Sequence, residues 1–451
     1  MNAFLVAAML AAAPDVAPEA TSPITLEEVR KLGRVNTSAL QSLLDLEVTE
    51  ADVGVSRSAL LPQLSLSASA GKNWQGRRQQ IVTSEDPNNP GGFLTFEVET
   101  PSVDTEAYDL GLSLTQVIYD RARFKQLEQS GVLRDAQKSQ TLEEADTSEL
   151  EAIRRFFVLF RTQATLKVLE ATVKRSEEQL ERARALFQAG RVGKNEEISA
   201  LVNLGNDRIN FTERLAQLVT DQTNLASWLA RPGTEPLLAV DPGVLTQEPA
   251  PAPAMDTALA QARERRPLLA ARQLQVRSAE LGRAIARADY IPRLTAQGIY
   301  SRQGPAADVV FTEPRLQNTF TAGINLTWNL FNGFATAANT RRAEANIRRA
   351  QLVLEQAARD IEADVRRSHR SLEAQIEAAR LAAANLEAAV QGLKLAEERF
   401  RAGAGSTLEV RDAQLSLTQA ELNLLENRID VEIARFTLMR AMGALSPGET
   451  K

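Results

Sequence analysis

Apolar residues recur at helical spacing along most of the chain, most clearly towards the C-terminus. Between Leu372 and Leu393 the apolar positions alternate steps of three and four residues, which predicts one face of a long helix. Gly403 and Gly405 then interrupt the pattern. A seven-residue repeat follows, made of Leu408, Leu415, Leu422, Ile429 and Phe436. Seven-residue spacing is typical of a coiled-coil seam, so we expect a second helix that returns alongside the first.

The same pattern of helix, glycine break and helix occurs earlier in the chain. Phe187-Gln-Ala-Gly190 corresponds to Phe400-Arg-Ala-Gly403. A helical hairpin that occurs twice indicates an internal duplication, with a first repeat over 25–230 and a second over 256–443. Each repeat contains one helix of roughly 68 residues, which is about 100 Å long at the usual rise per residue.

Four positions mark other helix ends. Leu61-Pro62 and Ile291-Pro292 are expected to form elbows from helix to strand, because proline cannot continue a helix and restricts the residue before it. Asp120 and Asn332 precede the two long helices. At such a position the side-chain oxygen can accept hydrogen bonds from the first free amides of the helix, so we expect both residues to be helix caps.

Two strands are expected in each repeat, because apolar residues alternate there with Ser, Thr or Gly. The four strands are expected at 62–70, 108–118, 292–302 and 319–331. The segments between the paired strands, 71–107 and 303–318, are predicted to be loops. The longer one is polar and contains the turn-forming residues Asp86-Pro-Asn-Asn-Pro-Gly-Gly92.

The predicted helix lengths fit one architecture. Two shorter helices stacked end to end match one long helix, with 195–230 on 256–289 and 406–442 on 25–60. All four strands then lie at one end and both glycine breaks at the other. The helical parts after the strands run over 120–230 and 332–442. The remaining segments are a proline-rich linker and a short tail, at 231–255 and 444–451.

One face of each predicted strand is apolar, and aromatic residues gather at the strand ends. These aromatic residues include Tyr108, Tyr119, Tyr290, Tyr300 and Trp328. Aromatic girdles of this kind mark the membrane interfaces of outer-membrane barrels. Four strands cannot close a barrel, and open edges in lipid leave backbone groups unpaired, so we expect three chains with twelve strands. A soluble sheet that caps a coiled coil is the alternative that the pattern leaves open.

The N-terminus and the composition narrow the class of protein. Residues 1–20 contain an apolar run as long as a secretory signal core, although no basic residue precedes it, so we expect a signal peptide. The net charge of −6 is mixed in sign along the helices, which does not favour nucleic acid as a partner. The chain has no cysteine and one histidine, His369, which we interpret as part of a solvated helix face. We therefore expect no metal, no cofactor and no enzyme activity.

Several short motifs recur in the same order in both repeats. They are Leu61-Pro62-Gln-Leu64, Ile291-Pro292-Arg-Leu294, Asn329-Leu-Phe-Asn-Gly333, and Glu398-Arg-Phe-Arg-Ala-Gly403 followed by Asp412-Ala-Gln414. Together with the duplication, they resemble the TolC-like outer membrane efflux protein family over about 25–443. The resemblance implies a mainly α fold with a transmembrane β-barrel contribution. It also implies a homotrimer, with a twelve-stranded barrel in the outer membrane of a Gram-negative bacterium and an α-helical tunnel through the periplasm.

The resemblance further implies a function and partners. Proteins of this family act as passive exit ducts of tripartite efflux pumps or type I secretion systems. They bind a periplasmic adapter protein and an inner-membrane transporter, and they lie in outer-membrane lipid. The alternative from another class is a soluble periplasmic coiled-coil scaffold or an adapter, which also uses helical hairpins. An adapter would need a lipoyl-like module and a β-barrel domain, and the sequence contains no segment that matches either.

The resemblance also assigns candidate site residues. Glu409 and Asp412 match two carboxylates that line the periplasmic constriction in the family, where six carboxylates in a trimer would favour cations. Arg411 replaces the usual apolar residue between them, and Glu196 takes the place of Glu409 in the first repeat. The alternative is that Glu409 and Asp412 only stabilise the start of a helix by charge–dipole interaction.

The glycines of both breaks are the candidate contacts with the adapter. These are Gly190, Gly193, Gly403 and Gly405. A tight turn between helices needs glycine in any case, so the adapter contact rests on the resemblance alone.

Overall fold

The computed structural model describes residues 22–231, 236–245, 247–313 and 318–445. The expected signal peptide and most of the expected tail lie outside the described residues. Contacts divide the chain into two compact units. Unit 1 comprises Met1–Glu47, Asp135–Leu274 and Gln351–Lys451, and unit 2 comprises Val48–Arg134 and Gln275–Ala350.

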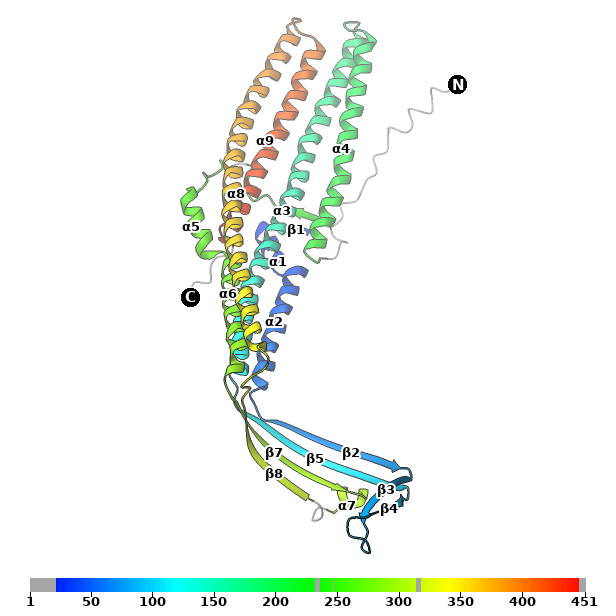
Figure 1. The fold of residues 1–451 in the computed structure, drawn as a ribbon. Coiled ribbons are helices and arrows are strands. Elements are labelled where there is room, and N and C mark those ends of the chain that lie inside the picture. The colour runs from blue at the N-terminus through cyan, green and yellow to red at the C-terminus, as the bar shows by residue number, and fades with distance from the viewer. Residues whose placement is uncertain (1–21, 232–235, 246, 314–317, 446–451) are drawn as a thin grey trace, which may run out of the picture. The chain divides into compact units, whose positions relative to one another are not determined.

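Helices form most of the described chain (Figure 1), and two of them are far longer than the rest, α3 (Arg121–Gln188) and α8 (Ala335–Arg401). The other helices are α1 (Leu26–Gly33), α2 (Thr37–Ser58), α4 (Lys194–Trp228), α5 (Met255–Arg265), α6 (Pro267–Ala286), the 3-10 helix η1 (Arg287–Tyr290), α7 (Ala307–Phe311) and α9 (Thr407–Ala441). The two long helices and the two returning helices match the sequence-based expectation, with small shifts of their ends.

The two shorter helices of the prediction are each interrupted. The helix expected over 256–289 divides at Arg266, whose extended backbone (ψ 116°) precedes Pro267 and ends α5. The helix expected over 25–60 divides into α1 and α2. Asn36 starts the second of them, because its side-chain oxygen accepts a hydrogen bond from the amide of Ala39 at 2.9 Å.

Four strands of unit 2 form one antiparallel sheet in the order β2-β5-β7-β8. They are β2 (Gln63–Gln75), β5 (Val103–Tyr119), β7 (Arg293–Gly304) and β8 (Asn318–Thr327). These correspond to the four expected strands. β2 and β5 extend further than expected into the segment between them.

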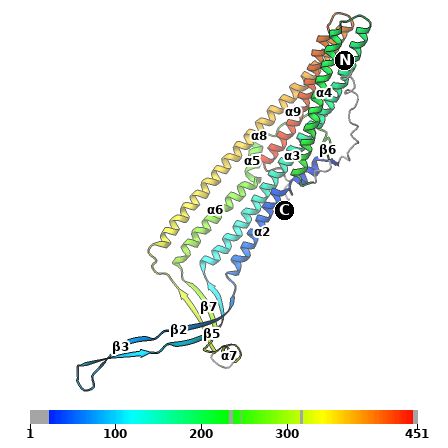
Figure 2. The same cartoon turned by 90° about the vertical axis from the view of Figure 1, so that its right-hand side faces the viewer.

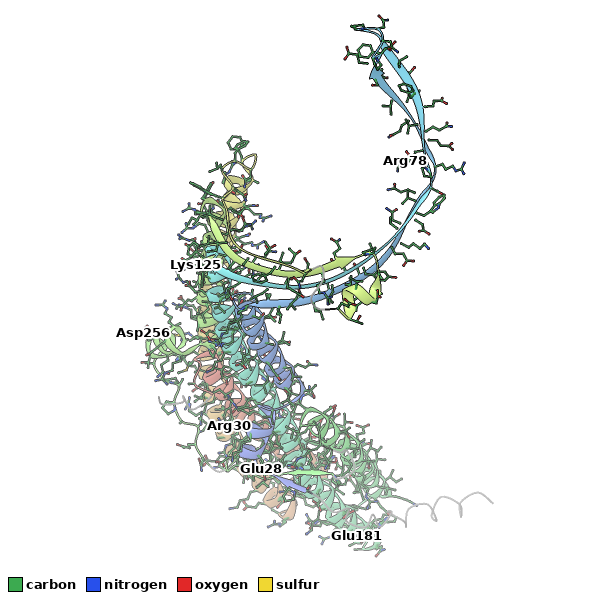
Figure 3. The ribbon with its side chains drawn as sticks, turned by 90° about the horizontal axis from the view of Figure 1, so that it is seen from below. Glu28, Arg30, Arg78, Lys125, Glu181 and Asp256 are labelled. Atoms are coloured by element: carbon green, nitrogen blue, oxygen red, sulfur yellow. The ribbon has the colours of Figure 1, made fainter. Side chains whose placement is uncertain are left out.

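A second hairpin occupies most of the segment that was predicted as a loop over 71–107. β3 (Arg78–Glu85) pairs with β4 (Phe93–Thr100), and the turn-forming residues 86–92 connect them. The polar composition misled the prediction, whereas the alternation in Phe93-Leu-Thr-Phe-Glu-Val98 was a valid strand signal. Figure 3 shows the hairpin with side chains on both faces and with Arg78 on β3.

The helices of unit 2 form a layer in the same order as the strands that they adjoin in sequence (Figure 2). The order follows from hydrogen bonds of Ser56 with Ser130, Gln129 with Ser278, and Arg287 with Glu344. These join α2 to α3, α3 to α6, and η1 to α8. α2 and α8 therefore lie at the two edges of the layer, as β2 and β8 lie at the two edges of the sheet.

Unit 1 contains the two helical hairpins, α3 with α4 and α8 with α9 (Figure 1). Its largest core is centred on Phe156 and Phe157 of α3, which are fully buried and pack edge to face with ring centroids 5.5 Å apart. Leu225 of α4 and Ile429 of α9 belong to the same apolar cluster. Phe436 packs against the same cluster, but Leu408 and Leu415, at the start of the seven-residue repeat, are 66% and 46% exposed. The predicted coiled-coil seam therefore joins the core only at its C-terminal end.

The segment 231–255, predicted as a linker outside the core, contributes to this cluster. β6 (Leu237–Ala239) pairs in parallel with β1 (Ser22–Ile24), and Leu237 and Ala239 are buried against the Phe156 core. Leu445, at the start of the expected tail, is also buried there. The high proline content concealed the short apolar run that forms β6.

His369 is buried, which contradicts its interpretation as part of a solvated face. Its residue exposure is 4%, and its Nε2 lies 2.7 Å from the carbonyl oxygen of Pro253. Because a carbonyl only accepts, Nε2 carries the proton in this hydrogen bond. The histidine thus attaches the proline-rich segment to α8. The neighbouring arginines on α8 gave the impression of a wholly solvated helix.

Replacing His369 with alanine is expected to loosen the described segment 247–254 from α8. The change removes a hydrogen bond that contributes about 1 kcal/mol and leaves the Pro253 carbonyl without its donor. Limited proteolysis should then cut this segment several-fold faster. Arg370→Ala is the matched control, because the Arg370 side chain is 76% exposed. Equal cleavage rates in both variants would show that His369 does not hold the segment.

Candidate gate and pore-lining residues

Both helical hairpins turn with the same backbone geometry. Gly190 and Gly403 have φ of 69° and 73°, in the left-handed region that favours glycine. The Gly190 amide donates to the carbonyl of Phe187 at 2.9 Å, and the Gly403 amide donates to that of Phe400 at 3.0 Å. In each hairpin the amide of the residue after this glycine donates to the carbonyl of the residue before the phenylalanine. This second hydrogen bond completes a Schellman motif. The duplicated sequence motif is therefore a duplicated turn.

The returning helices begin directly after these turns. Gly193 is the N-cap of α4, and Ser406 is the N-cap of α9. The Ser406 hydroxyl accepts a hydrogen bond from the amide of Glu409 at 3.2 Å. Glycine at position 405 is also favoured for a steric reason, because a Cβ there would lie 3.1 Å from the backbone nitrogen of Phe400. The turn alone accounts for glycine at positions 190, 403 and 405. At Gly193 φ is −77°, and an added Cβ would meet only the side chain of Asn195.

Glu409 and Asp412 are both exposed on α9. Glu409 is in the first turn, where a carboxylate stabilises the helix dipole. Asp412 lies one turn further, beyond the reach of that effect. Charge–dipole stabilisation therefore accounts for Glu409 but not for Asp412. The nearest described cation to Glu409 is Arg399, whose Nε lies 3.7 Å from the carboxylate.

Arg411 does not contact either of these carboxylates. Its guanidinium forms two hydrogen bonds of 3.0 Å with the carboxylate of Asp207 on α4. It also lies 3.2 Å from the hydroxyl of Ser176 on α3, which itself donates to Asp207. The side chains of Arg411 and Asp207 are only 15% and 7% exposed. This cluster joins α9 to α3 and α4, and no sequence motif pointed to Asp207 or Ser176 as partners.

Replacing Arg411 with alanine is expected to loosen α9 from α4 near the turn. Asp207 would stay buried with only the Ser176 hydroxyl, and the loss of a charged hydrogen-bonded pair costs about 2 kcal/mol. Hydrogen exchange of the first turns of α9 should rise by more than tenfold at that cost. Arg411→Lys should restore part of the protection, since lysine keeps the charge but not the paired geometry. Arg401→Ala, at an exposed position, is the control.

Glu196 is the candidate carboxylate of the first hairpin. The hydroxyl of Thr407, the first residue of α9, donates to its carboxylate. Glu196 thus links the two hairpins. Next to it is a groove of about 620 Å³ with a polar lining, which includes Ser199, Asn203, Asn206 and Asn210 of α4 together with Arg411 and Asp412 of α9.

The four-stranded sheet has one apolar and one hydroxyl-rich face. The register aligns Leu64 with Leu114 and Leu66 with Leu112 on the first. It aligns Ser65 with Ser113 on the second, and their hydroxyls lie 2.7 Å apart. Other members of the apolar face are Leu110, Leu294, Ala296, Tyr300, Phe320, Ile324 and Leu326. A sheet with these two faces suits a position between lipid and water.

Aromatic residues lie towards both ends of the apolar face. Trp328 donates from its indole nitrogen to the carbonyl of Tyr290 at 3.1 Å near one end. Tyr119 joins that end, because an irregularity after Val117 shifts it onto the face of Leu294. Tyr108 and Tyr300 lie towards the other end. From Tyr108 to Tyr119 the strand rises roughly 26 Å at a tilt of about 45°, close to the apolar height of an outer-membrane protein.

The caps and elbows lie where the helices of unit 2 meet its strands. Asp120 accepts hydrogen bonds from the amides of Ala122 and Arg123 at 2.9 and 3.3 Å and starts α3. Asn332 lies three residues before α8, and its oxygen is 3.5 Å from the amide of Thr336. The two long helices therefore start differently. Pro62 and Pro292 each directly precede a strand.

No described helix combines the length and hydropathy that a membrane-spanning helix requires. Among the same residues, no group of three or more His, Asp or Glu side chains is arranged to hold a metal ion.

Comparison with known proteins gives a consistent result. The family model of outer membrane efflux proteins matches residues 36–231 and 258–444, which are the two repeats. Outer membrane protein TolC of Vibrio cholerae is 24% identical over 397 residues, covering 87% of this chain and 84% of the relative. The CmeC outer membrane channel of Campylobacter jejuni has 16% identity, a TM-score of 0.74, and coverage of 97% and 92% of the two chains. A membrane protein of Pseudomonas aeruginosa has 18% identity, a TM-score of 0.75, and coverage of 95% and 93%.

The chain belongs to the outer membrane efflux protein family, and its place is the outer membrane of a Gram-negative bacterium. The fold class expected from the sequence, long duplicated helical hairpins with a small number of strands, is confirmed. A soluble scaffold or an adapter, the alternative that the sequence left open, is set aside by the family match to both repeats.

Proposed function

We propose that three copies of this chain form a ring that acts as a passive exit duct. The observation that carries the proposal is that the sheet and the helix layer of unit 2 are open at the same two edges. Among the described residues, β2 and β8 each pair on one side only. Unpaired backbone groups in lipid cost several kcal/mol each, so the edges need partners. Pairing β8 of one copy with β2 of the next gives twelve strands for three copies.

The two edge helices of unit 2 also have complementary surfaces. On α2, Val48 and Val55 are seven residues apart and 60% and 67% exposed, and Asp52 lies beside them. On α8, Ala338 and Ala345 are likewise seven residues apart. Exposed arginines flank them, namely Arg341, Arg342, Arg348 and Arg349. An apolar seam with acidic residues on one helix and basic residues on the other is typical of paired helices.

A crosslinking experiment tests the ring. Because the chain contains no native cysteine, only the introduced cysteines can react. The double variant Val55→Cys, Ala338→Cys should give linked dimers and trimers with a short bismaleimide, in membranes and in detergent. Each single variant should remain monomeric, because like edges do not meet in a head-to-tail ring. Crosslinked dimers or trimers from a single variant would contradict the proposal. Recovery of the protein as a soluble monomer without detergent would also contradict it.

The same proposal assigns the periplasmic constriction to Glu409 and Asp412. Both are exposed in one chain and one helical turn apart, so three copies would bring six carboxylates to a shared opening. Carboxylates around a narrow mouth favour cations. Arg411 leaves their charge intact, because Asp207 holds its guanidinium. The unusual arginine therefore supports the hairpin and does not neutralise the gate.

The hairpin turns are the proposed contact with a periplasmic adapter protein, which in turn connects to an inner-membrane transporter. Gly190, Gly193, Gly403 and Gly405 keep the turns tight and leave backbone groups accessible to a partner. The duct itself contributes no energy, and the transporter drives efflux or type I secretion. Because the two turns have the same backbone geometry, a partner can bind both hairpins in the same way.

A further inference from the structure

Arg302 of β7 is a charged residue on the apolar face of the four-stranded sheet. The register places it directly opposite Leu110. Alternate residues of a strand share a face, so Arg302 lies on the same face as Leu112 and Tyr300. Its row lies between the row of Leu112 and that of Tyr108, and therefore inside the band that the aromatic residues delimit. A cation in this position is costly beside lipid unless the protein covers its charge.

The cover over Arg302 is α7, the short helix between β7 and β8 in the sequence. Arg302 is only 5% exposed, and its Nη2 atom donates to the carbonyl of Val309 at 2.6 Å and to the carbonyl of Glu313. A helix leaves its last carbonyls without an internal partner, so these oxygens can accept from the guanidinium. α7 packs on β5 and β7, and its Val310 is fully buried. The helix is thus attached to the apolar face and hides the charge there.

The outer side of α7 faces whatever surrounds the apolar face of the sheet. β5 and β7 are the two inner strands (Figure 2), so copies joined at β2 and β8 would not reach α7. The protein lies in the outer membrane, so lipid is the partner that adjoins this face. Phe311 is 46% exposed on α7, and Asp308, three residues earlier and on the same side, is exposed as well. A side that combines a phenylalanine with a carboxylate suits the boundary between lipid headgroups and acyl chains.

We propose that α7 is a lipid-contacting element that covers the charge of Arg302 and inserts Phe311 among the outer-leaflet lipids of the outer membrane. The inference rests on the proposed ring, which turns the apolar face of the sheet towards lipid. The leaflet follows from the position of α7, because the row of Tyr108 lies towards the end of the sheet that is farther from the helices. Arg302 is a positioning residue here. It holds α7 flat on the sheet through backbone carbonyls, and α7 in turn keeps lipid away from the guanidinium.

A nitroxide label on a single introduced cysteine tests the lipid contact, since the chain has no native cysteine. The labelled full-length protein is reconstituted in liposomes of phosphatidylethanolamine and phosphatidylglycerol. Collisions with oxygen, which concentrates in lipid, are compared with collisions with a water-soluble nickel chelate. The ratio of oxygen to nickel collisions at Phe311→Cys should approach that at Leu112→Cys, on the open part of the apolar face. Gln303→Cys is the control on the hydroxyl-rich face and should give a several-fold lower ratio.

A second pair of variants tests the role of Arg302. In the Phe311→Cys protein, Arg302→Met removes the donor to both carbonyls and keeps an unbranched apolar stem. The label should then become more mobile, which narrows its spectrum, and nickel collisions should increase. Arg302→Lys retains a charged donor and should restore part of the original spectrum. An unchanged spectrum in Arg302→Met would show that Arg302 does not hold α7.

Failure of this inference is distinguishable from failure of the ring. If the label at Leu112→Cys reports lipid but the label at Phe311→Cys reports water, α7 does not contact lipid, and the proposed placement of the sheet stands. If both labels report water, the apolar face does not adjoin lipid, and both proposals fall. If the label at Phe311→Cys collides with neither reagent, protein covers α7, and the lipid contact is wrong.

Discussion

Replacing Glu143 with alanine is expected to destabilise the protein by about 3–5 kcal/mol, the penalty for breaking a buried ion pair from one side. Glu143 of α3 is 5% exposed. Its carboxylate accepts from the Nε and Nη2 atoms of Arg266 at 2.8–3.2 Å and from Arg440 at 2.8 Å. Arg266 is itself 3% exposed, so its charge has no route to water.

The two arginines make the loss larger than for a simple pair. Burial, and next the positive charge of Arg266, lowers the pKa of the Arg440 guanidinium below its ordinary value. Glu143 is the carboxylate between these two cations. Without it, Arg266 would keep only its hydrogen bonds from Nη1 to the carbonyls of Arg440 and Ala441. These carbonyls cannot balance two like charges.

Thermal unfolding in detergent, followed by circular dichroism of the helices, measures the effect. The midpoint for Glu143→Ala should fall well below that of the unchanged protein. Glu178→Ala, an exposed carboxylate on the same helix, is the control and should leave the midpoint within error. If both variants had the same unfolding midpoint, the buried network of Glu143 would not be a main source of stability in unit 1.

Removing the two candidate gate carboxylates should produce the largest functional change. The double variant Glu409→Ala, Asp412→Ala is expected to raise single-channel conductance in planar bilayers and to reduce the preference for cations. In the proposed ring, three copies would lose six negative charges at the proposed constriction, which would remove its electrostatic attraction for cations. Because both side chains are exposed, the fold should tolerate the change.

The control for this experiment is Glu398→Ala. It removes one exposed carboxylate per copy from the same hairpin but from the other helix. It should leave both conductance and cation preference unchanged. An unaltered cation preference in the double variant would place the constriction elsewhere on the hairpins. Asp412→Ala alone should account for much of the effect, because Glu409 is also engaged in starting α9.

The hairpins and the long helices were predictable from the sequence because their signals are local. A break such as Phe400-Arg-Ala-Gly403 specifies its own turn, and the apolar stripe of α8 repeats over many turns. The two faces of the sheet were visible for the same reason, as in the alternation of Leu64, Leu66 and the serines between them.

The misjudged features depend on distant partners or on competing composition. His369 lies among charged residues on the long helix α8, and only the packing of a segment more than a hundred residues away buries it. Arg411 looked like a perturbation of the gate because its partner, Asp207, is on another helix. For β3 and β4, the prolines and glycines of 86–92 outweighed a real strand alternation.

The hydroxyl-rich face of the sheet has a consequence for cargo. From the level of Asp109 to the level of Arg293, this face presents Ser, Thr, Asn, Gln, Gly, Ile and Val over the described strands, with no charged side chain between. In the proposed ring it lines the passage. A neutral, hydrated wall neither attracts nor repels a solute by its charge, and neutral hydroxyls bind passing groups only weakly compared with water. Acidic, basic and neutral molecules would traverse that stretch alike, which leaves discrimination by charge to the proposed constriction and to whatever loads the duct.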